Sequence, residues 1–351
     1  MPTLYAALDD RLLVVRGERA ADGGPSSAAA AGDREAAGDW TATEALASRE
    51  FECVAASRDA PDRVFAGTVG SGLQRSEDGG RTWEPVGGFG DRVTAVTVSP
   101  HDPESVWAGT EPSAVYRSFD GGDTWERCGG LTDLPSADRW SFPPRPHTHH
   151  VRWLAVNPHD PAHVYVAIEA GAFVRTLDRG DTWEPHPKGG RRDNHTLATH
   201  PEAPCRVYAA AGDGYAESPD CGAFWTSPQE GLEHRYVWGL AVDPGDPDTV
   251  VVSAARGARR AHWPDSAEAY VYRRESEEVG AGRWTPAMEG LPDPQGTVRA
   301  VFAAADPGEF YALTNRGLFG SGDAARSWQG LDVEWPAAYE SQVGRGLTVV
   351  G

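Results

Sequence analysis

The sequence has almost no lysine, few cysteines and no long apolar run. Lys188 is the only lysine among 351 residues, and Asp and Glu outnumber Lys and Arg by 52 to 32, which gives a formal charge of −20. Such an acidic surface repels nucleic acid and anionic membranes, so we expect neither as a partner. No stretch of about 18 apolar residues could span a bilayer, and the first residues, MPTLYAALDD, lack the basic and apolar segments of a secretory signal. We therefore expect a soluble, cytoplasmic protein.

The excess of acidic residues favours a halophilic, haloarchaeal source. Molar salt shortens the range of the repulsion between carboxylates to about 3 Å, so an acidic surface is tolerated there. GC-rich codon usage is the alternative explanation. It accounts for the replacement of lysine by arginine but not for the excess of acid.

The four cysteines are too widely spaced to form a CxxC motif, so neither a zinc knuckle nor a thioredoxin-type site is indicated. They are Cys53, Cys128, Cys205 and Cys221. We expect free thiols as the default. A disulfide between Cys205 and Cys221 remains open, because these residues would flank two paired strands of one repeat at the same end.

An internal repeat runs through nearly the whole chain. Its clearest copy spans residues 93–128, and the segment 151–186 repeats it almost position for position. Each copy reads as an apolar strand, a turn rich in Asp and Pro, a second strand, a short loop, a third strand, an Asp-Gly turn and a strand with Thr-Trp. The pattern predicts four short strands in each repeat.

The turn before the last strand carries the most specific signal. Its copies are SEDGGRTW (76–83), SFDGGDTW (118–125), TLDRGDTW (176–183), SPDCGAFW (218–225) and a degenerate SGDAARSW ending at Trp328. The aspartate can accept hydrogen bonds from turn amides, glycine supplies a positive φ, and tryptophan fills the space beneath the hairpin. These features predict a role in folding.

These turns match the Asp-box, and the chain resembles the BNR-repeat group, which includes sialidases, sortilin-type receptors, xyloglucanases and photosystem assembly factors. In that group the box lies away from the functional site. The resemblance therefore implies that the box aspartates are not catalytic. They are Asp78, Asp120, Asp178, Asp220 and Asp323.

The repeat and the resemblance predict one all-β domain over 1–351, a single seven-bladed β-propeller of four-stranded antiparallel blades. Fourth-strand tryptophans count seven blades: Trp40, Trp83, Trp125, Trp183, Trp225, Trp284 and Trp328. We expect the blades at 4–46 with 341–350, 51–86, 92–128, 150–186, 194–227, 236–287 and 297–335. The C-terminal strand should join the N-terminal blade, because ring closure removes exposed sheet edges. The Ala/Gly/Asp-rich segment 17–39 is expected to be a disordered insertion.

One residue near the start of each inner strand should face the channel, and we call this place the mouth position. Its seven residues are Glu52, Thr94, Arg152, His195, Trp238, Arg299 and Arg345. Three arginines in so acidic a chain could clamp a carboxylate or phosphate. Aromatic residues of the same region could stack on a sugar. The predicted ligand-binding residues are Arg152, Arg299, Arg345, Trp238, Tyr236 and Trp263.

The arginines are similar to the arginine triad of sialidases, although the chain lacks an Arg-Ile-Pro element. A Tyr-Glu nucleophile pair is suggested only loosely by Tyr236 and Glu233. The alternative is that the arginines pair with nearby Asp or Glu and stabilise the channel.

A second kind of site is suggested by the histidines that fall in loops assigned to the mouth: His147, His149, His150, His195, His234 and His262. His149, His195 and His234 come from different blades, and we predict that they bind a divalent metal together with Glu169 or Asp193. No short-range ligand spacing supports this set, so it depends wholly on the topology.

Two classes of function fit these features. The first is a non-catalytic scaffold that binds a small anionic or carbohydrate ligand, or a protein partner, at the channel mouth. The alternative is an enzyme, either glycoside-hydrolase-like or a metal-dependent lyase or hydrolase, with Glu52, Glu169 and Asp193 as catalytic carboxylates and Asp91 and Glu111 as further candidates. The fold alone does not separate these classes.

Overall fold

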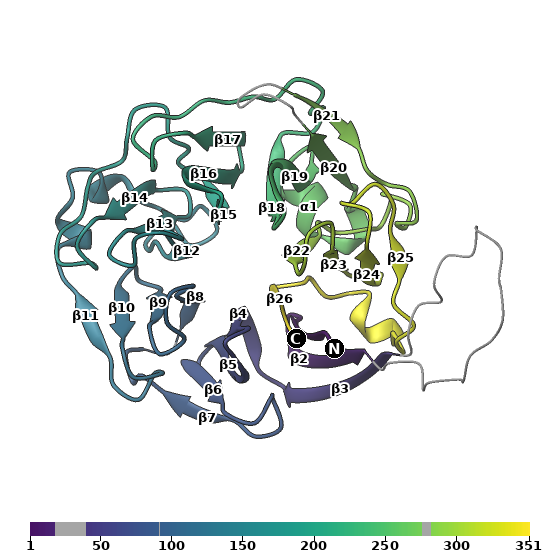
Figure 1. The fold of residues 1–351 in the computed structure, drawn as a ribbon, viewed down its shortest axis with the longest axis horizontal. Coiled ribbons are helices and arrows are strands. Elements are labelled where there is room, and N and C mark those ends of the chain that lie inside the picture. The colour runs from purple at the N-terminus through teal and green to yellow at the C-terminus, as the bar shows by residue number, and fades with distance from the viewer. Residues whose placement is uncertain (18–39, 91, 276–281) are drawn as a thin grey trace.

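The computed structural model describes residues 1–17, 40–90, 92–275 and 282–351. These residues form seven small antiparallel sheets, arranged radially around a common axis (Figure 1). The predicted seven-bladed β-propeller is therefore confirmed. Residues 18–39, which make up nearly all of the predicted insertion, lie outside the described part of the chain. No helix among the described residues is long and apolar enough to cross a bilayer.

The two ends of the chain meet in the first blade. Its strand order is β26 (Gly346–Val350), β1 (Thr3–Ala7), β2 (Arg11–Gly17) and β3 (Trp40–Ala47). Strand β26 pairs antiparallel with β1, from Thr3 opposite Val350 to Ala7 opposite Gly346. This pairing closes the ring and confirms the predicted role of the C-terminal strand.

Four further blades contain four strands each. The second has β4 (Glu50–Ser57), β5 (Ala60–Val69), β6 (Leu73–Ser76) and β7 (Glu84–Val86), and the third has β8 (Val93–Val98), β9 (Val106–Thr110), β10 (Val115–Ser118) and β11 (Glu126–Cys128). The sixth has β18 (Tyr236–Asp243), β19 (Asp246–Ala255), β20 (Ala269–Glu275) and β21 (Arg283–Pro286), and the seventh has β22 (Val301–Ala304), β23 (Phe310–Thr314), β24 (Gly317–Ser321) and β25 (Gln329–Gly330).

The fourth and fifth blades differ from the prediction because each contains only three strands. They comprise β12 (Val151–Val156), β13 (Val164–Ile168) and β14 (Ala172–Thr176), and β15 (Asn194–His200), β16 (Ala203–Ala211) and β17 (Gly214–Ser218). A single bridge replaces the outer strand in each, Arg175 to Glu184 and Glu217 to Thr226. The only described α-helix, α1 (Ala258–His262), lies in the loop between β19 and β20, and short 3-10 turns occupy Leu131–Asp133, Ala137–Arg139, Pro264–Ser266 and Ala337–Tyr339.

Neighbouring blades pack face to face through apolar side chains. Strand β13 is buried along its whole length, because blades cover it on both sides. The Asp-box tryptophans contribute to the same packing: Trp225 is 5% exposed, and its ring centroid lies 4.8 Å from that of Phe173 in the preceding blade. The box therefore ties adjacent blades together.

The Asp-box aspartates are occupied by their own turns. The Asp120 carboxylate accepts hydrogen bonds from the Ser118 hydroxyl at 2.8 Å and from the Thr124 amide at 2.9 Å. The Thr124 hydroxyl donates to it as well, and these hydrogen bonds lower the pKa of Asp120 to about 2. Trp125 completes the turn, with its indole N–H donating to the carbonyl of Gly122 at 2.9 Å.

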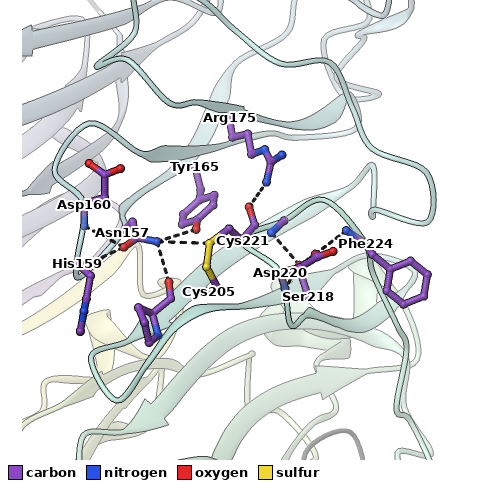
Figure 2. The surroundings of a disulfide bond; sticks show 12 residues. Asn157, His159, Asp160, Tyr165, Arg175, Cys205, Ser218, Asp220, Cys221 and Phe224 are labelled. Atoms are coloured by element: carbon purple, nitrogen blue, oxygen red, sulfur yellow. Dashed lines mark hydrogen bonds between the residues drawn. A yellow bond between two sulfur atoms is a disulfide. The ribbon is translucent and has the colours of Figure 1, made fainter.

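Cys205 and Cys221 form a disulfide, whereas Cys53 and Cys128 are buried free thiols. The default expectation of four free thiols is therefore wrong for this pair. Figure 2 shows the bond beside the Asp-box turn of the fifth blade, where Asp220 lies. Disulfides persist mainly in oxidising compartments, so this bond does not by itself support the cytoplasmic location that we expected.

Candidate functional site

Each residue at the mouth position leaves the regular alternation of its inner strand. In five blades the register of the strand shifts at this residue, which marks a β-bulge: Glu52, Thr94, Arg152, His195 and Trp238. Arg299 lies two residues before β22, and Arg345 directly precedes β26. A bulge re-aims a side chain that would otherwise pack between blades. The irregularity is a property of the fold, and the residue placed there differs from blade to blade.

Side chains from four blades contact the ring of Trp238, and one of them, His262, belongs to the same blade as Trp238. The guanidinium carbons of Arg152 and Arg299 lie 4.8 and 4.5 Å from its centroid. The rings of His195 and His262 lie at centroid distances of 4.1 and 4.3 Å. Residues that are far apart in the sequence therefore meet at one point, as the predicted topology requires.

A cavity of about 1040 Å³ opens beside this cluster. The loop before β12 supplies Phe142, and the loop that contains α1 supplies the exposed Trp263. Both loops are the long insertions of the repeat, so the chain departs from its regular length where it frames the cavity. Six predicted site residues line it: Glu169, Asp193, Tyr236, Trp238, Trp263 and Arg345.

The three arginines are neutralised to different degrees. Arg345 Nε donates to Asp9 Oδ1 at 2.6 Å, and Arg152 Nε lies 3.6 Å from Glu169 Oε2. Arg299 is fully buried and donates from Nη1 to the carbonyl of Gly344, while its Nε and Nη2 have no hydrogen-bond partner in the described part of the chain.

The pKa of Arg299 reflects this environment. Burial lowers it well below its usual range, and the positive charges of Arg345 and Arg152 lower it further. The expected alternative of paired arginines thus describes Arg345 well, but not Arg299.

Glu169 is the buried carboxylate of the cavity. His150 Nε2 lies 2.9 Å from its Oε2. Burial raises its pKa, but the hydrogen bond from His150 and the charges of His150, His195 and Arg152 outweigh burial and leave the pKa below its usual range. His150 was not among the predicted ligands, although the HTHH sequence that contains it pointed to this loop.

Asp193 and Tyr236 complete the wall. Burial raises the pKa of Asp193, although the nearby charge of His195 opposes this. The Tyr236 hydroxyl lies 3.1 Å from His262 Nε2 in α1, and burial lowers the pKa of His262 well below its usual value. The sequence had placed His262 in a mouth loop, although His262 was not one of the three chosen metal ligands.

The other predicted carboxylates lie elsewhere. Glu52 is ion-paired with Arg92 and lines a smaller cavity of about 240 Å³, which shares Asp9 and Arg345 with the larger one. Glu111 is held by Arg145 through two hydrogen bonds of 2.8 and 2.6 Å. Asp91 lies outside the described residues.

The predicted trio of metal-binding histidines is not assembled. His149 packs edge-on against Trp140 at a centroid distance of 5.5 Å, and His234 stacks on Tyr270 at 4.2 Å and bonds to the hydroxyl of Tyr272. Among the described residues, the ligand atoms of Glu169, Asp193 and His195 lie within 4.8 Å of one another. Of the three predicted histidines, His195 is the one that belongs to this cluster, together with both predicted carboxylates.

Comparisons with known proteins agree with this architecture. Residues 116–127 match the BNR/Asp-box repeat family. A GH74 enzyme from Niastella koreensis is similar with a TM-score of 0.61 and 16% identity, over 80% of this chain and 46% of that one. The GH74 xyloglucanase from Xanthomonas campestris is similar with a TM-score of 0.57 and 18% identity, over 81% of this chain and 47% of that one.

A third similar structure is YCF48 bound to D1 peptide, with a TM-score of 0.56 and 17% identity, over 85% of this chain and 92% of that one. Among curated proteins, none matches this sequence. The chain spans less than half the length of the GH74 chains that it matches, and at these identities the likeness shows the fold alone. The chain is thus a seven-bladed β-propeller that carries BNR/Asp-box repeats.

Proposed function

We propose that this protein is a binding propeller whose channel mouth takes a small anionic, sugar-like ligand. The observation that carries the proposal is Arg299, which is fully buried against Trp238 and whose Nε and Nη2 have no hydrogen-bond partner within the described residues. A buried, incompletely paired guanidinium costs stability. Arg299 does not line the cavity, but Trp238 does, so an anion bound in the cavity would offset the charge of Arg299 from the other side of the Trp238 ring.

The lining of the cavity supports the same class of ligand. Tyr236 and the exposed Trp263 supply aromatic rings on which a sugar can stack, and Arg345 places a positive charge on the wall. The volume is at the upper end of the roughly 300–1,000 Å³ usual for small-molecule sites. A sugar acid combines a ring that stacks with a carboxylate that pairs.

The experiment is a calorimetric titration of the protein with glucuronate, with glucose as the neutral match. We expect glucuronate to bind at least about tenfold more tightly, because only its carboxylate can pair with Arg345 on the cavity wall. Equal binding of both sugars, or no saturable binding of either, would reject the proposal. A peptide with a free carboxylate belongs in the same series, because the similar YCF48 structure is bound to a peptide.

One observation favours a second candidate, a glycoside-hydrolase-like enzyme. Glu169 and Asp193 both line the cavity, and their nearest ligand atoms lie within 4.8 Å, close to the roughly 5–5.5 Å between the carboxyl groups of retaining glycosidases. Hydrolysis of aryl glycosides that is lost in Glu169→Gln and Asp193→Asn would establish this activity. Binding of glucuronate without any turnover would favour the scaffold.

A further inference from the structure

Three donor atoms from two segments, in neighbouring blades, converge on the floor of the cavity. They belong to Glu169, which follows β13, to Asp193, which precedes β15, and to His195 within β15, and they lie within 4.8 Å of one another. Glu169 and Asp193 line the cavity, and His195 is completely buried behind them. Carboxylates crowded together are common on protein surfaces, so the histidine decides what this cluster means.

His195 is fixed in one tautomer. Its Nδ1 lies 2.7 Å from the carbonyl oxygen of Val237, which can only accept a hydrogen bond. Nδ1 therefore carries the proton in the neutral ring, and that form leaves the lone pair on Nε2. Within the described residues Nε2 has no hydrogen-bond partner, and it lies 3.7 Å from Asp193 Oδ2. A backbone carbonyl that orients the far side of the ring is the usual support for a metal-ligating histidine.

Each of the two carboxylates also has one oxygen that contacts another group of the protein. Asp193 Oδ1 accepts the backbone N–H of Ala170 at 3.0 Å. The contacts of Glu169 with His150 and with Arg152 both use Oε2. Asp193 Oδ2 lies nearest to His195 Nε2, and one carboxylate oxygen of Glu169 lies within 4.8 Å of both donor atoms.

We infer that Glu169, Asp193 and His195 form a binding site for a divalent cation at the base of the mouth cavity. One imidazole nitrogen and two carboxylate oxygens suit Zn²⁺ or Mn²⁺ better than Mg²⁺ or Ca²⁺, which prefer oxygen ligands alone. Three protein ligands leave coordination positions open, and these face the cavity. The positive charge of Arg152 beside Glu169 opposes the cation and moderates its affinity.

The test is a calorimetric titration of the full chain with ZnCl₂, after chelator treatment and without a polyhistidine tag. We expect one site per chain. Asp193→Asn should weaken Zn²⁺ binding at least about 100-fold, more than the 10–100-fold that loss of an outer hydrogen-bond partner costs. Asp265→Asn is the matched control, because Asp265 lines the same cavity but is not in the cluster.

Several outcomes would overturn the inference: no saturable Zn²⁺ binding, equal binding by Asp193→Asn and wild type, or binding of Mg²⁺ as tight as that of Zn²⁺. Diffraction at the zinc edge from Zn²⁺-soaked wild-type crystals gives a second measurement that needs no variant. It should place one anomalous peak between the three side chains, and a peak elsewhere would refute the site. Neither measurement uses a sugar acid. A failure to bind Zn²⁺ would therefore refute the cation site without deciding whether glucuronate binds.

Discussion

The Asp-box turns and the mouth position are both repeated around the ring, yet they differ in what is conserved between blades. Five blades keep the Asp and the Trp of the turn, and the Asp120 carboxylate is satisfied by its own Ser118 and Thr124. The mouth position carries different residues, and Arg299 and His195 keep nitrogen atoms without partners in the described chain. In the Asp-box turns, where the repeat is maintained, the polar groups are hydrogen-bonded within the fold. At the mouth position, where the repeat diverges, polar groups remain available to a ligand.

The largest expected effect is a difference in the free energy of unfolding between two tryptophan variants. Trp225→Ala should lower the free energy of unfolding by about 3–5 kcal/mol, because it removes a buried ring that packs between blades. Trp263→Ala should change it by less than about 0.5 kcal/mol, since Trp263 is 60% exposed. Urea unfolding monitored by circular dichroism measures both. Equal losses would mean that Trp263 also belongs to the core and is not free to meet a ligand.

His163, in the turn between β12 and β13, should make the stability of the protein depend on pH. Burial, together with the charge of Arg175, lowers the pKa of His163 to about 4. Below its ordinary pKa of about 6.5, the unfolded chain takes up a proton that the folded chain refuses, so stability falls as the pH drops from about 6.5 to 4. The slope is about 1.4 kcal/mol per pH unit, with a total of no more than about 3 kcal/mol.

The variant His163→Gln should lose this part of the pH dependence, as measured by urea unfolding at pH 7 and pH 4.5. His159→Gln is the matched control on the same turn, where the side chain is exposed. The account of His163 fails if wild type and His163→Gln lose the same stability on acidification.

Replacement of two equally buried arginines by methionine should have different effects on the free energy of unfolding. Arg299→Met should leave stability unchanged or raise it by about 1–2 kcal/mol, because it removes a buried charge with few partners. Arg274 lies in the wall between blades and is bonded to Glu217 at 2.7 Å, so Arg274→Met should cost about 3–5 kcal/mol. Calorimetric unfolding compares them. A large loss in Arg299→Met would make Arg299 a structural residue.

The smallest expected effect comes from one substitution made in the two regions. Asp120→Asn should lower the melting temperature by a few degrees and leave Zn²⁺ binding intact, because it weakens only a turn. Asp193→Asn should leave the melting temperature of the metal-free protein nearly unchanged and remove Zn²⁺ binding. Thermal unfolding with and without ZnCl₂ checks both. The distinction between the two regions would be contradicted if Asp120→Asn no longer bound Zn²⁺.

The sequence predicted the ring well because its information is local and repeated. The spacing of Trp83 and Trp125 reflects the length of one blade, and the apolar character of residues 346–350 identified the closing strand. Alignment of the inner strands also found the mouth position, since a β-bulge recurs at nearly the same place in five of the seven blades.

The direction of individual side chains was harder to predict. His149 and His234 lie in loops of the mouth, but Trp140 and Tyr270 draw their rings into packing contacts. The partner of Arg345 is Asp9, which stands at the other end of the chain. Such contacts depend on loop conformations that no repeat specifies.

The central claim is that the mouth position, and not the Asp-box, binds the ligand. The most direct measurement is the calorimetric affinity for glucuronate of the wild type, Arg345→Gln and Asp120→Asn. Arg345 lines the cavity, whereas the Asp120 carboxylate is held within its own turn. The account predicts at least about tenfold weaker binding in Arg345→Gln and wild-type binding in Asp120→Asn. Equal affinity in all three proteins, or a loss confined to Asp120→Asn, would contradict it.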